Sequence, residues 1–357
     1  MNEQLTPDLE VCDAPSYRSL TLDEVADRLE NANNALILTH VNPDGDCVGS
    51  AFALALLIGE RGGTARVICS GELPKRLRFL APTEDYSVLA GGDLDISPYD
   101  CIFSVDVASP GQLGDLSCLI PNISFMIDHH VTGEPFAECF VDFTASSAGE
   151  IVYRLYRMLR ERGSVGAVPE AARRMYAAIV SDTGSFKFAN TSPETHLAAS
   201  ELVGEINSAD DGGLDTSEVC RALFGQRTLK ELTAQMLSIQ NLRFFENGRL
   251  GAVLFTRTML EEAGLTDEDI GNIVDTPRGV EGVLVGISLR QLSSDPTQYK
   301  VSSRANTDID CASVCARFGG GGHVRAAGCT IAAETPEEAL ETAVAAFGEA
   351  IRAARGE

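Results

Sequence analysis

The chain has 357 residues, 44% of them hydrophobic and 22% charged, which is the balance of a globular protein with room for two domains. Its formal net charge is -24 at pH 7, and the sequence shows no basic stripe that could follow the phosphates of a long nucleic acid. We therefore exclude long nucleic acid as a partner. A small phosphorylated ligand held by metal ions and a few local cations remains compatible with this charge.

The sequence contains no run of roughly 18 apolar residues, the length of a membrane span, and its polar, acidic start lacks the pattern of a signal peptide. Ten cysteines are scattered without any C-x-x-C pair, so we expect reduced, mostly buried thiols and no disulfide scaffold. A zinc set of Cys311, Cys315, His323 and Cys329 fits no zinc-site spacing. These features predict a cytoplasmic protein with no membrane partner.

Residues 1–20 are expected to form a flexible extension, and residues 21–207 the larger domain. Short apolar runs alternate there with helical segments. The runs lie at 35–40, 65–70, 101–106 and 123–128, and the helices at 47–62, 149–159 and 169–180. This alternation predicts an α/β fold with a parallel sheet covered by helices on both faces. Ser147 and Glu150 predict a capping box before the second of these helices.

Residues 208–242 are predicted to be a polar linker followed by one long helix, from about Ser217, that bridges two domains. Residues 243–357 would form a smaller α/β domain. Its strand-like runs lie at 250–256, 280–290 and 298–305, ahead of a glycine-rich segment at 319–328. Thr335 and Glu338, with Pro336 between them, predict a second capping box at the start of the last helix.

Acidic residues and histidines follow the apolar runs and one helix of the larger domain. They are His40, Asp44, Asp46, Asp106, Asp128, His129, His130 and Asp182. Ligands in open α/β sheets bind outside the carboxyl ends of the strands, so these side chains would meet in one cluster. Singly, each has a simpler interpretation, such as a turn for Asp44-Gly45-Asp46 or a helix cap for Asp106. Their gathering in one domain favours metal binding.

Carboxylates mixed with imidazoles suit Mn²⁺ foremost, with Mg²⁺, Co²⁺ or Fe²⁺ as alternatives. The set of ligands is too large for one ion, so we predict two. Two ions about 3.5–4 Å apart can share a bridging carboxylate and a bridging water. That water becomes a hydroxide near neutral pH and can attack phosphorus in line.

The glycine run Gly319–Gly322, followed by His323, is the second candidate site. Consecutive glycines let the backbone approach a ligand closely and present N–H groups to an anion. The run does not follow a strand and open a helix, and no GK[ST] follows it, which argues against a Rossmann or Walker loop. Together with Arg304 and Arg325 it predicts an anion pocket, since arginine can hold phosphate through two hydrogen bonds.

The segments HVNPDGDCVGS, VDVAS, IDHHVTG and SDTGSF resemble motifs I to IV of the DHH phosphoesterases, in the same order. VSSRAN and FGGGGHVRAAG resemble the associated DHHA1 domain. The resemblance spans roughly residues 33–330 and is strongest to the stand-alone bifunctional oligoribonuclease/pAp phosphatases, the nanoRNases. It implies a parallel-sheet DHH domain that faces a smaller α/β DHHA1 domain across a cleft.

The resemblance also implies a role for each motif residue. One Mn²⁺ ion would be held by His40 and Asp44, the other by Asp46, His129 and Asp182, with Asp106 bridging both. Asp128 would orient a histidine, and His130 would face the substrate phosphate and stabilise the transition state. The far phosphate or nucleoside end would be held by Arg304, Gly319, Gly320, Gly321, Gly322 and His323. Ser303 and Asn306 depart from the usual motif and are expected to tune substrate choice.

Two activities remain open. The first is hydrolysis of oligoribonucleotides of about two to five nucleotides to mononucleotides, with conversion of pAp to AMP. The alternative is a phosphodiesterase acting on the cyclic dinucleotide c-di-AMP. An inorganic pyrophosphatase would lack GGGGH, a RecJ-type exonuclease would be longer with a basic channel, and a mere nucleotide-binding regulator would need no two-metal centre. The expected partners are short RNA, pAp or dinucleotides, and a homodimer is compatible.

Overall fold

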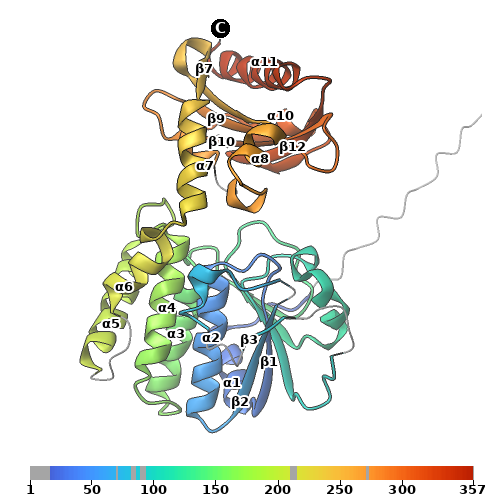
Figure 1. The fold of residues 1–357 in the computed structure, drawn as a ribbon. Helices are drawn as coiled ribbons and strands as arrows, with labels where there is room; N and C mark the ends of the chain where they lie inside the picture. Colours follow the sequence, from blue (N-terminus) through green and yellow to red (C-terminus); the bar gives the residue numbers. More distant parts are fainter. Residues whose placement is uncertain are drawn as a thin grey trace, which may run out of the picture. The chain divides into compact units, whose positions relative to one another are not determined.

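The computed structural model describes residues 17–69, 71–81, 86–88, 94–209, 215–270 and 273–356. The chain divides into two compact units, Met1–Gln226 and Arg227–Glu357 (Figure 1). Residues 1–16 of the expected extension lie outside the described residues. The end of that stretch belongs to the fold, because Ser19 pairs with Cys139 and the Leu20 side chain is buried. No helix in the described part of the chain is long and apolar enough to cross a membrane.

The first unit contains a six-stranded, all-parallel sheet in the order β3-β2-β1-β4-β5-β6. Its strands are β1 (Asn34–Leu38), β2 (Thr64–Cys69), β3 (Tyr86–Val88), β4 (Cys101–Val105), β5 (Phe125–Asp128) and β6 (Cys139–Val141). The strand order reverses between β1 and β4, and ligand sites of such sheets form at this point. The parallel sheet is therefore confirmed, with β3 and β6 as two short strands that the sequence pattern did not predict.

Helices cover the first sheet on both faces. They are α1 (Leu22–Asn31), α2 (Gly45–Glu60), α3 (Ala148–Glu161), α4 (Pro169–Asp182), α5 (Pro193–Ser208), α6 (Thr216–Cys220) and the 3-10 segment η2 (Pro110–Asn122). Side chains of α1 to α4 form one core with the sheet, and η2 forms a smaller core on the opposite face. Helices α2 and α4 pack closely (Figure 1), since a Cβ on Gly49 would lie 2.6 Å from the Arg174 carbonyl oxygen. Glycine is thus required where α2 meets α4.

The two predicted capping boxes are only half formed. The Ser147 hydroxyl accepts a hydrogen bond from the Glu150 N–H, as expected, but the Glu150 carboxylate binds the N–H and hydroxyl of Ser146. At the last helix, Thr335 likewise accepts from the Glu338 N–H, while the carboxylate of Glu338 accepts from the Glu334 N–H. Both glutamates reach one residue further back than a capping box requires.

The predicted long bridging helix is two helices in the structure. Helix α6 continues into a π-helical turn, η3 (Arg221–Gly225), and ends there within the first unit. Helix α7 (Leu229–Gln240) begins in the second unit with its own capping box, formed by Thr228 and Glu231. The helix signals on the two sides of Gly225–Arg227 therefore belong to separate elements.

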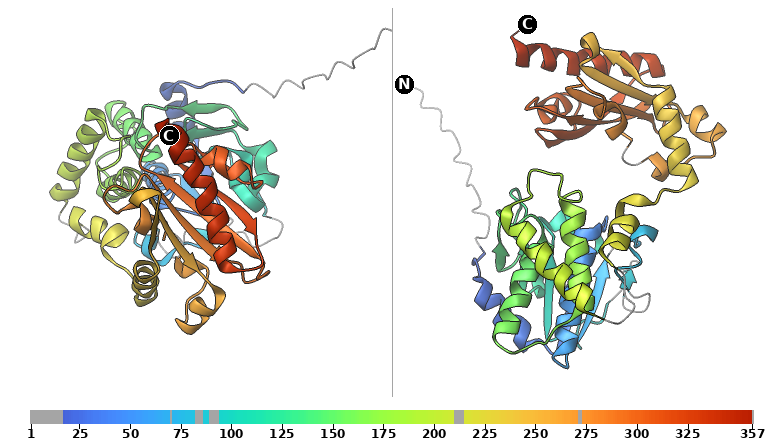
Figure 2. Two further views of the ribbon diagram at one scale, coloured as in Figure 1. Left: turned by 90° about the horizontal axis from the view of Figure 1, so that it is seen from above. Right: turned by 90° about the vertical axis from the view of Figure 1, so that its left-hand side faces the viewer.

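The second unit contains a mixed sheet in the order β11-β12-β10-β9-β8-β7. Its strands are β7 (Arg243–Phe245), β8 (Leu250–Phe255), β9 (Val285–Gln291), β10 (Gln298–Ala305), β11 (Gly321–His323) and β12 (Ala326–Ala332). Among the described strands of this sheet, only the β8–β9 pair is parallel. The helices that follow α7 are α8 (Arg257–Glu262), α9 (Asp275–Arg278), α10 (Cys311–Ala316) and α11 (Pro336–Arg355). Helix α11 lies along one face of this sheet, and α7 packs against the other (Figure 2).

Candidate metal centre

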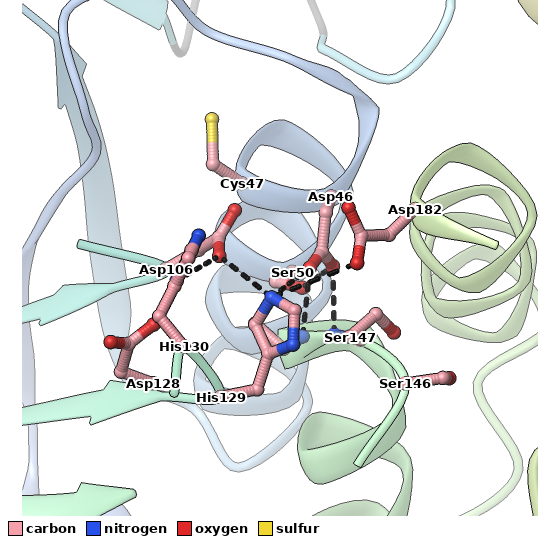
Figure 3. A network of polar contacts seen from close by, with 12 residues as sticks. Asp46, Cys47, Ser50, Asp106, Asp128, His129, His130, Ser146, Ser147 and Asp182 are labelled. Atoms are coloured by element: carbon pink, nitrogen blue, oxygen red, sulfur yellow. Dashed lines mark hydrogen bonds and ion pairs between the residues drawn. The ribbon is translucent and has the colours of Figure 1, made fainter. Parts of the chain in front are cut away.

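The predicted cluster forms at the carboxyl edge of the first sheet. His40 lies just beyond β1, Asp106 just beyond β4, and Asp128 ends β5. The start of α2 and the end of α4 bring further carboxylates to the same place (Figure 3). All eight predicted residues of this unit meet here: His40, Asp44, Asp46, Asp106, Asp128, His129, His130 and Asp182. The close packing of α2, α3 and α4 thus sets the geometry of the ligand cluster.

Asp106 occupies the centre of the cluster. Its side chain is 3% exposed, and its Oδ1 has no hydrogen-bond partner although it is buried. Oδ1 lies 3.5 Å from Nε2 of His129, and Oδ2 lies 3.7 Å from Nε2 of His40. The backbone of Asp106 has φ +60°, a region that non-glycine residues seldom adopt and that is often found at functional sites. Each oxygen of this carboxylate therefore faces a different histidine.

His129 faces three carboxylates at once. Its Nε2 lies 3.5 Å from Oδ1 of Asp106, 3.6 Å from Oδ2 of Asp46 and 3.7 Å from Oδ2 of Asp182 (Figure 3). These separations are too long for hydrogen bonds. They are close to the roughly 3.0–3.5 Å between neighbouring ligands of one divalent ion with bonds of about 2.1 Å. The arrangement fits a cation between the four side chains.

A second group of donors surrounds the other oxygen of Asp106. Nε2 of His40 lies 3.7 Å from Oδ1 of Asp44, and the thiol of Cys47 completes a set whose donor atoms lie within 4.8 Å of one another. Asp44 is also the N-cap of α2, since its Oδ1 accepts from the N–H groups of Asp46 and Cys47. The helix-cap interpretation and the ligand interpretation of Asp44 are therefore compatible.

Asp46 is fixed by the start of another helix. Its Oδ1 accepts hydrogen bonds from the Gly149 N–H (2.9 Å) and the Ser50 hydroxyl (3.1 Å), and its Oδ2 accepts from the Ala148 N–H (2.8 Å). The carboxylate thus satisfies N–H groups in the first turn of α3, where negative charge is favoured. This anchor holds the Oδ2 of Asp46 in place near His129.

The electrostatics of the cluster show a shortage of positive charge. Burial raises the pKa of Asp46 well above its ordinary value, and the carboxylates of Asp106 and Asp182 add to the effect. Burial also raises the pKa of Asp182 to about 6. Burial opposes charge on His129, but Asp106 and Asp46 outweigh it and raise the pKa of His129 to about 10. A buried cluster that takes up protons in this way is chemically suited to divalent cations.

Asp128 contacts a histidine and does not face the carboxylate cluster. Its Oδ1 lies 2.7 Å from Nδ1 of His130, and its side chain is 2% exposed. The His130 ring is 38% exposed and packs near the ring of His129, with centroids 4.6 Å apart. With Nδ1 occupied by Asp128, the Nε2 of His130 is the nitrogen left for a ligand.

The second unit places Arg304 and His323 on the same face of its sheet. Arg304 pairs with Ala326 of β12, and Ala326 pairs with His323 of β11, so the three residues form one row. The guanidinium of Arg304 donates to the Ser303 carbonyl and has no carboxylate partner within the described residues, whereas Arg325 pairs with Asp308. Arg304 is therefore the better anion-binding candidate of the two arginines.

The glycine run forms an exposed hairpin strand. Gly321 and Gly322 pair with Gly328 and Ala327 of β12, and Gly322 has φ +140°. A Cβ on Gly322 would lie 2.5 Å from the Ala326 carbonyl oxygen, so the neighbouring strand already requires this glycine. The neighbouring strand thus explains why position 322 is a glycine, in addition to the predicted contact of the run with an anion.

The two departures from the family motif have structural explanations. Ser303 is fully buried and donates to the Ala327 carbonyl, so its hydroxyl does not face a ligand, contrary to the predicted tuning of substrate choice. The Asn306 amide donates to the carbonyls of Arg278 and Val283 and so links the end of β10 to the segment that runs from α9 to β9. Both residues hold the fold around Arg304.

Two family models match the chain, the DHH family N-terminal domain over residues 34–179 and the DHHA1 domain over residues 251–353. The bifunctional oligoribonuclease and PAP phosphatase NrnA of Thermus thermophilus is 31% identical over 315 residues, which cover 88% of this chain and 89% of that protein. The chain belongs to the DHH phosphoesterase family. Its two units are accordingly a DHH unit and a DHHA1 unit.

Other proteins similar to this DHH phosphoesterase carry several names. NrnA of Bacillus subtilis is 28% identical over 298 residues, covering 82% of this chain and 87% of that protein. The cyclic-di-AMP phosphodiesterase PdeA of Listeria monocytogenes is 22% identical and covers 89% of this chain but 48% of that protein. An exopolyphosphatase-related protein of Bacteroides fragilis has the same fold, with a TM-score of 0.79 and 22% identity over 92% of this chain and 95% of that one.

Two residues of the DHH unit escaped the sequence prediction. Cys47 follows the HVNPDGD motif directly, and burial raises the pKa of its thiol to about 12. Asn190 donates to the carbonyls of Ser146 and Asp182 and so fixes the end of α4 against the start of α3. Nothing in the local sequence marks Asn190, because both of the groups that it binds are backbone carbonyls, which any residue type can supply. For Cys47, adjacency to Asp46 was the available signal.

Proposed function

We propose that this DHH phosphoesterase hydrolyses oligoribonucleotides of about two to five nucleotides to mononucleotides and converts pAp to AMP. The observation that carries the proposal is Asp106, whose two oxygens face His40 and His129 in a buried cluster of acids. A carboxylate in this position suits two cations at once, as in two-metal hydrolases of phosphate esters. The names of the relatives from Thermus and Bacillus support this choice of substrate.

The proposed ligand sets divide the cluster in two. One ion would be held by His40 and Asp44, the other by Asp46, His129 and Asp182, and Asp106 would be shared. Carboxylate and imidazole donors favour Mn²⁺, with Mg²⁺, Co²⁺ or Fe²⁺ as alternatives. When bound, two such ions supply an activated water and neutralise charge on the phosphate.

The remaining residues of the proposed site bind and orient the substrate. Asp128 would keep Nδ1 of His130 occupied, so that Nε2 donates a hydrogen bond to a phosphate oxygen as charge develops. In the DHHA1 unit, Arg304, His323 and the N–H groups of Gly319–Gly322 would hold the far phosphate or the nucleoside end.

The second candidate is hydrolysis of the cyclic dinucleotide c-di-AMP, favoured by the similarity to the Listeria phosphodiesterase. We favour linear substrates, because the oligoribonucleases match at higher identity and over nearly their full length.

The deciding experiment compares pAp, a linear diribonucleotide and c-di-AMP in one Mn²⁺-dependent hydrolysis assay. Fast cleavage of pAp and the dinucleotide, with little of c-di-AMP, is the expected result. A preference for c-di-AMP would leave the proposed metal centre unchanged and make the cyclic dinucleotide the substrate. Metal-stripped protein should regain turnover when Mn²⁺ is added, and failure to do so would leave a binding protein without catalysis.

We also propose that the protein works in the cytoplasm, on short ligands rather than long nucleic acid. We further propose that it forms a homodimer through α7. Leu229, Leu232, Met236 and Ile239 are exposed on this helix at heptad spacing, the pattern that pairs helices. Sedimentation analysis should give a dimer for the wild type and a monomer for Met236→Glu. A monomeric wild type at high concentration contradicts the dimer.

A further inference from the structure

One face of the DHHA1 sheet carries a set of donors that the proposed function leaves unused. Residues directly opposite in neighbouring strands point to the same face. In β10 and β9, Lys300 lies opposite Arg290 and Ser302 lies opposite Ser288, on the face that also carries Arg304. The face opposite to it packs against α10 and α11. Two cationic rows, one at Arg304 and one at Lys300, therefore flank a row of serines.

A cavity of about 190 Å³ opens on this face, wholly within the DHHA1 unit. Phe255, Ile270 and Ile273 form its apolar wall. Its polar side is lined by Ser288, Arg290, Lys300 and Ser302 from the sheet, together with Asp267. An apolar wall with a few convergent polar groups is the usual composition of a ligand site.

Several donors that line this cavity have no acceptor among the described residues. The Nε of Arg290 is buried without a hydrogen-bond partner, although its Nη1 donates to the Asp267 carbonyl and lies 3.4 Å from the Asp267 carboxylate. Lys300 forms no ion pair, and the hydroxyls of Ser288 and Ser302 form no hydrogen bond, with any residue in the described ranges. Lys300 is exposed and Ser302 is half-buried, so of these donors it is the Arg290 Nε that is buried without a partner. Buried polar groups normally have partners, so this Nε indicates a ligand that offers an acceptor.

The charge of the cavity gives the chemical class of that ligand. Two cations against one carboxylate leave a net positive charge in a chain whose formal net charge is -24. Arginine, lysine and serine hydroxyls together are the usual partners of phosphate oxygens. An anionic ligand with several oxygen acceptors satisfies every donor of the cavity.

We propose that this cavity is a subsite for the phosphate backbone of substrates longer than a dinucleotide. The proposal rests on the proposed function and adds how the protein would discriminate between substrates of different length. Lys300 lies four residues from Arg304 along β10, about 14 Å at roughly 3.4 Å per residue. A substrate with one phosphate held in the Arg304 and His323 row reaches the cavity only when it carries further nucleotides beyond that phosphate. A dinucleotide or pAp ends before it.

The test is kcat/KM of the Mn²⁺-loaded full chain on pAp and on ribonucleotides of about two to five units. Lys300→Gln should lower kcat/KM about 3- to 10-fold for the three longer substrates and leave pAp and the dinucleotide unchanged. Arg317→Gln is the matched control, because it removes the same charge from an exposed arginine that pairs with Glu349 of α11. This control should leave every substrate unchanged.

The outcomes separate the subsite from the proposed function. If Lys300→Gln affects all lengths equally or none, the subsite is wrong while the hydrolase stands. Ser302→Asp, which adds a negative charge inside the cavity, should lower kcat/KM further and for longer substrates only. If the wild type cleaves no oligoribonucleotide, the proposed function fails. Fluorescence anisotropy with a labelled pentaribonucleotide then tests the cavity by itself, and equal affinity of wild type and Lys300→Gln overturns it.

Discussion

The Nδ1 of His130 lies 2.7 Å from the Oδ1 of Asp128, a buried carboxylate at the end of β5. The hydrogen bond to Asp128 raises the pKa of His130, and its effect exceeds that of burial, which lowers this pKa. It also decides which ring nitrogen is free, because a carboxylate can only accept the Nδ1 proton. In the proposed site, Asp128 contacts neither an ion nor the substrate. It nevertheless fixes the orientation of His130, which would contact the phosphate.

The first prediction concerns this pair. Asp128→Asn should lower kcat by about 10- to 100-fold with little change in KM, because loss of such a partner leaves the histidine poorly oriented. Bound metal, measured by mass spectrometry, should stay at the wild-type ratio. His130→Ala should cost a similar factor, and adding Asp128→Asn to it should cost almost nothing more. An additive double variant would mean that Asp128 acts through some other group.

The second prediction tests the shared ligand. Asp106→Asn should abolish turnover, since both proposed ions lose one charged oxygen. Asparagine tolerates the φ of +60° at this position, whereas Asp106→Ala adds backbone strain, so thermal unfolding of the metal-free Asn variant should stay close to wild type. Near-normal turnover in either variant would overturn the hypothesis that the cluster binds two metal ions through Asp106.

The third prediction separates anchoring from metal binding. Asp46→Asn should lose metal and also about 1–3 kcal/mol of folding free energy, because an amide cannot accept all the bonds from Ala148, Gly149 and Ser50. Asp182→Asn should lose metal with much less effect on stability, since no backbone N–H binds the Asp182 carboxylate in the described part of the chain. Urea unfolding of the metal-free variants compares the two, and equal losses would contradict the assigned anchor.

The cluster could be predicted from the sequence because parallel strands deliver their following residues to one edge. His40, Asp106 and Asp128 each follow or end a buried apolar strand, so topology alone brings them together. The anchor of Asp46 could not be predicted, because its partner Gly149 lies 103 residues away on another helix. Local sequence carries no trace of such a contact.

The capping boxes are incomplete because more than one contact can satisfy such a short-range pattern. The S-x-x-E pattern at Ser147 fits a capping box, but the Glu150 carboxylate binds Ser146 and Thr195. The glycines at 319–322 are still predicted to contact an anion, and Gly322 is in addition required by the hairpin with β12. The strands β3 and β6 have three residues each, too few to show a periodic pattern.

The fourth prediction concerns acid stability. Burial raises the pKa of Glu150, but hydrogen bonds from Ser146, Thr195 and Arg154 outweigh it, so the folded-state pKa lies below the ordinary value of 4.5. A depressed folded-state pKa stabilises the protein above the unfolded value, and this stability is lost as pH falls through the folded one. Glu150→Gln should therefore cost about 1–3 kcal/mol near pH 7. The difference from wild type in urea unfolding should shrink below about pH 4.5, and a constant difference would contradict the mechanism.

The last prediction concerns the DHHA1 unit. His323→Ala and Arg304→Ala should raise KM for pAp about 10-fold or more and leave the metal content unchanged, because neither side chain belongs to the cluster around Asp106. Arg304→Lys should recover only part of the affinity, since an ammonium group cannot donate two parallel hydrogen bonds to a phosphate. Arg325→Ala is the control, because its guanidinium is already paired with Asp308. If His323→Ala emptied the metal sites, His323 would be a ligand of the ions. If Arg325→Ala instead matched Arg304→Ala, the row of Arg304 and His323 would not be the place where the far phosphate binds.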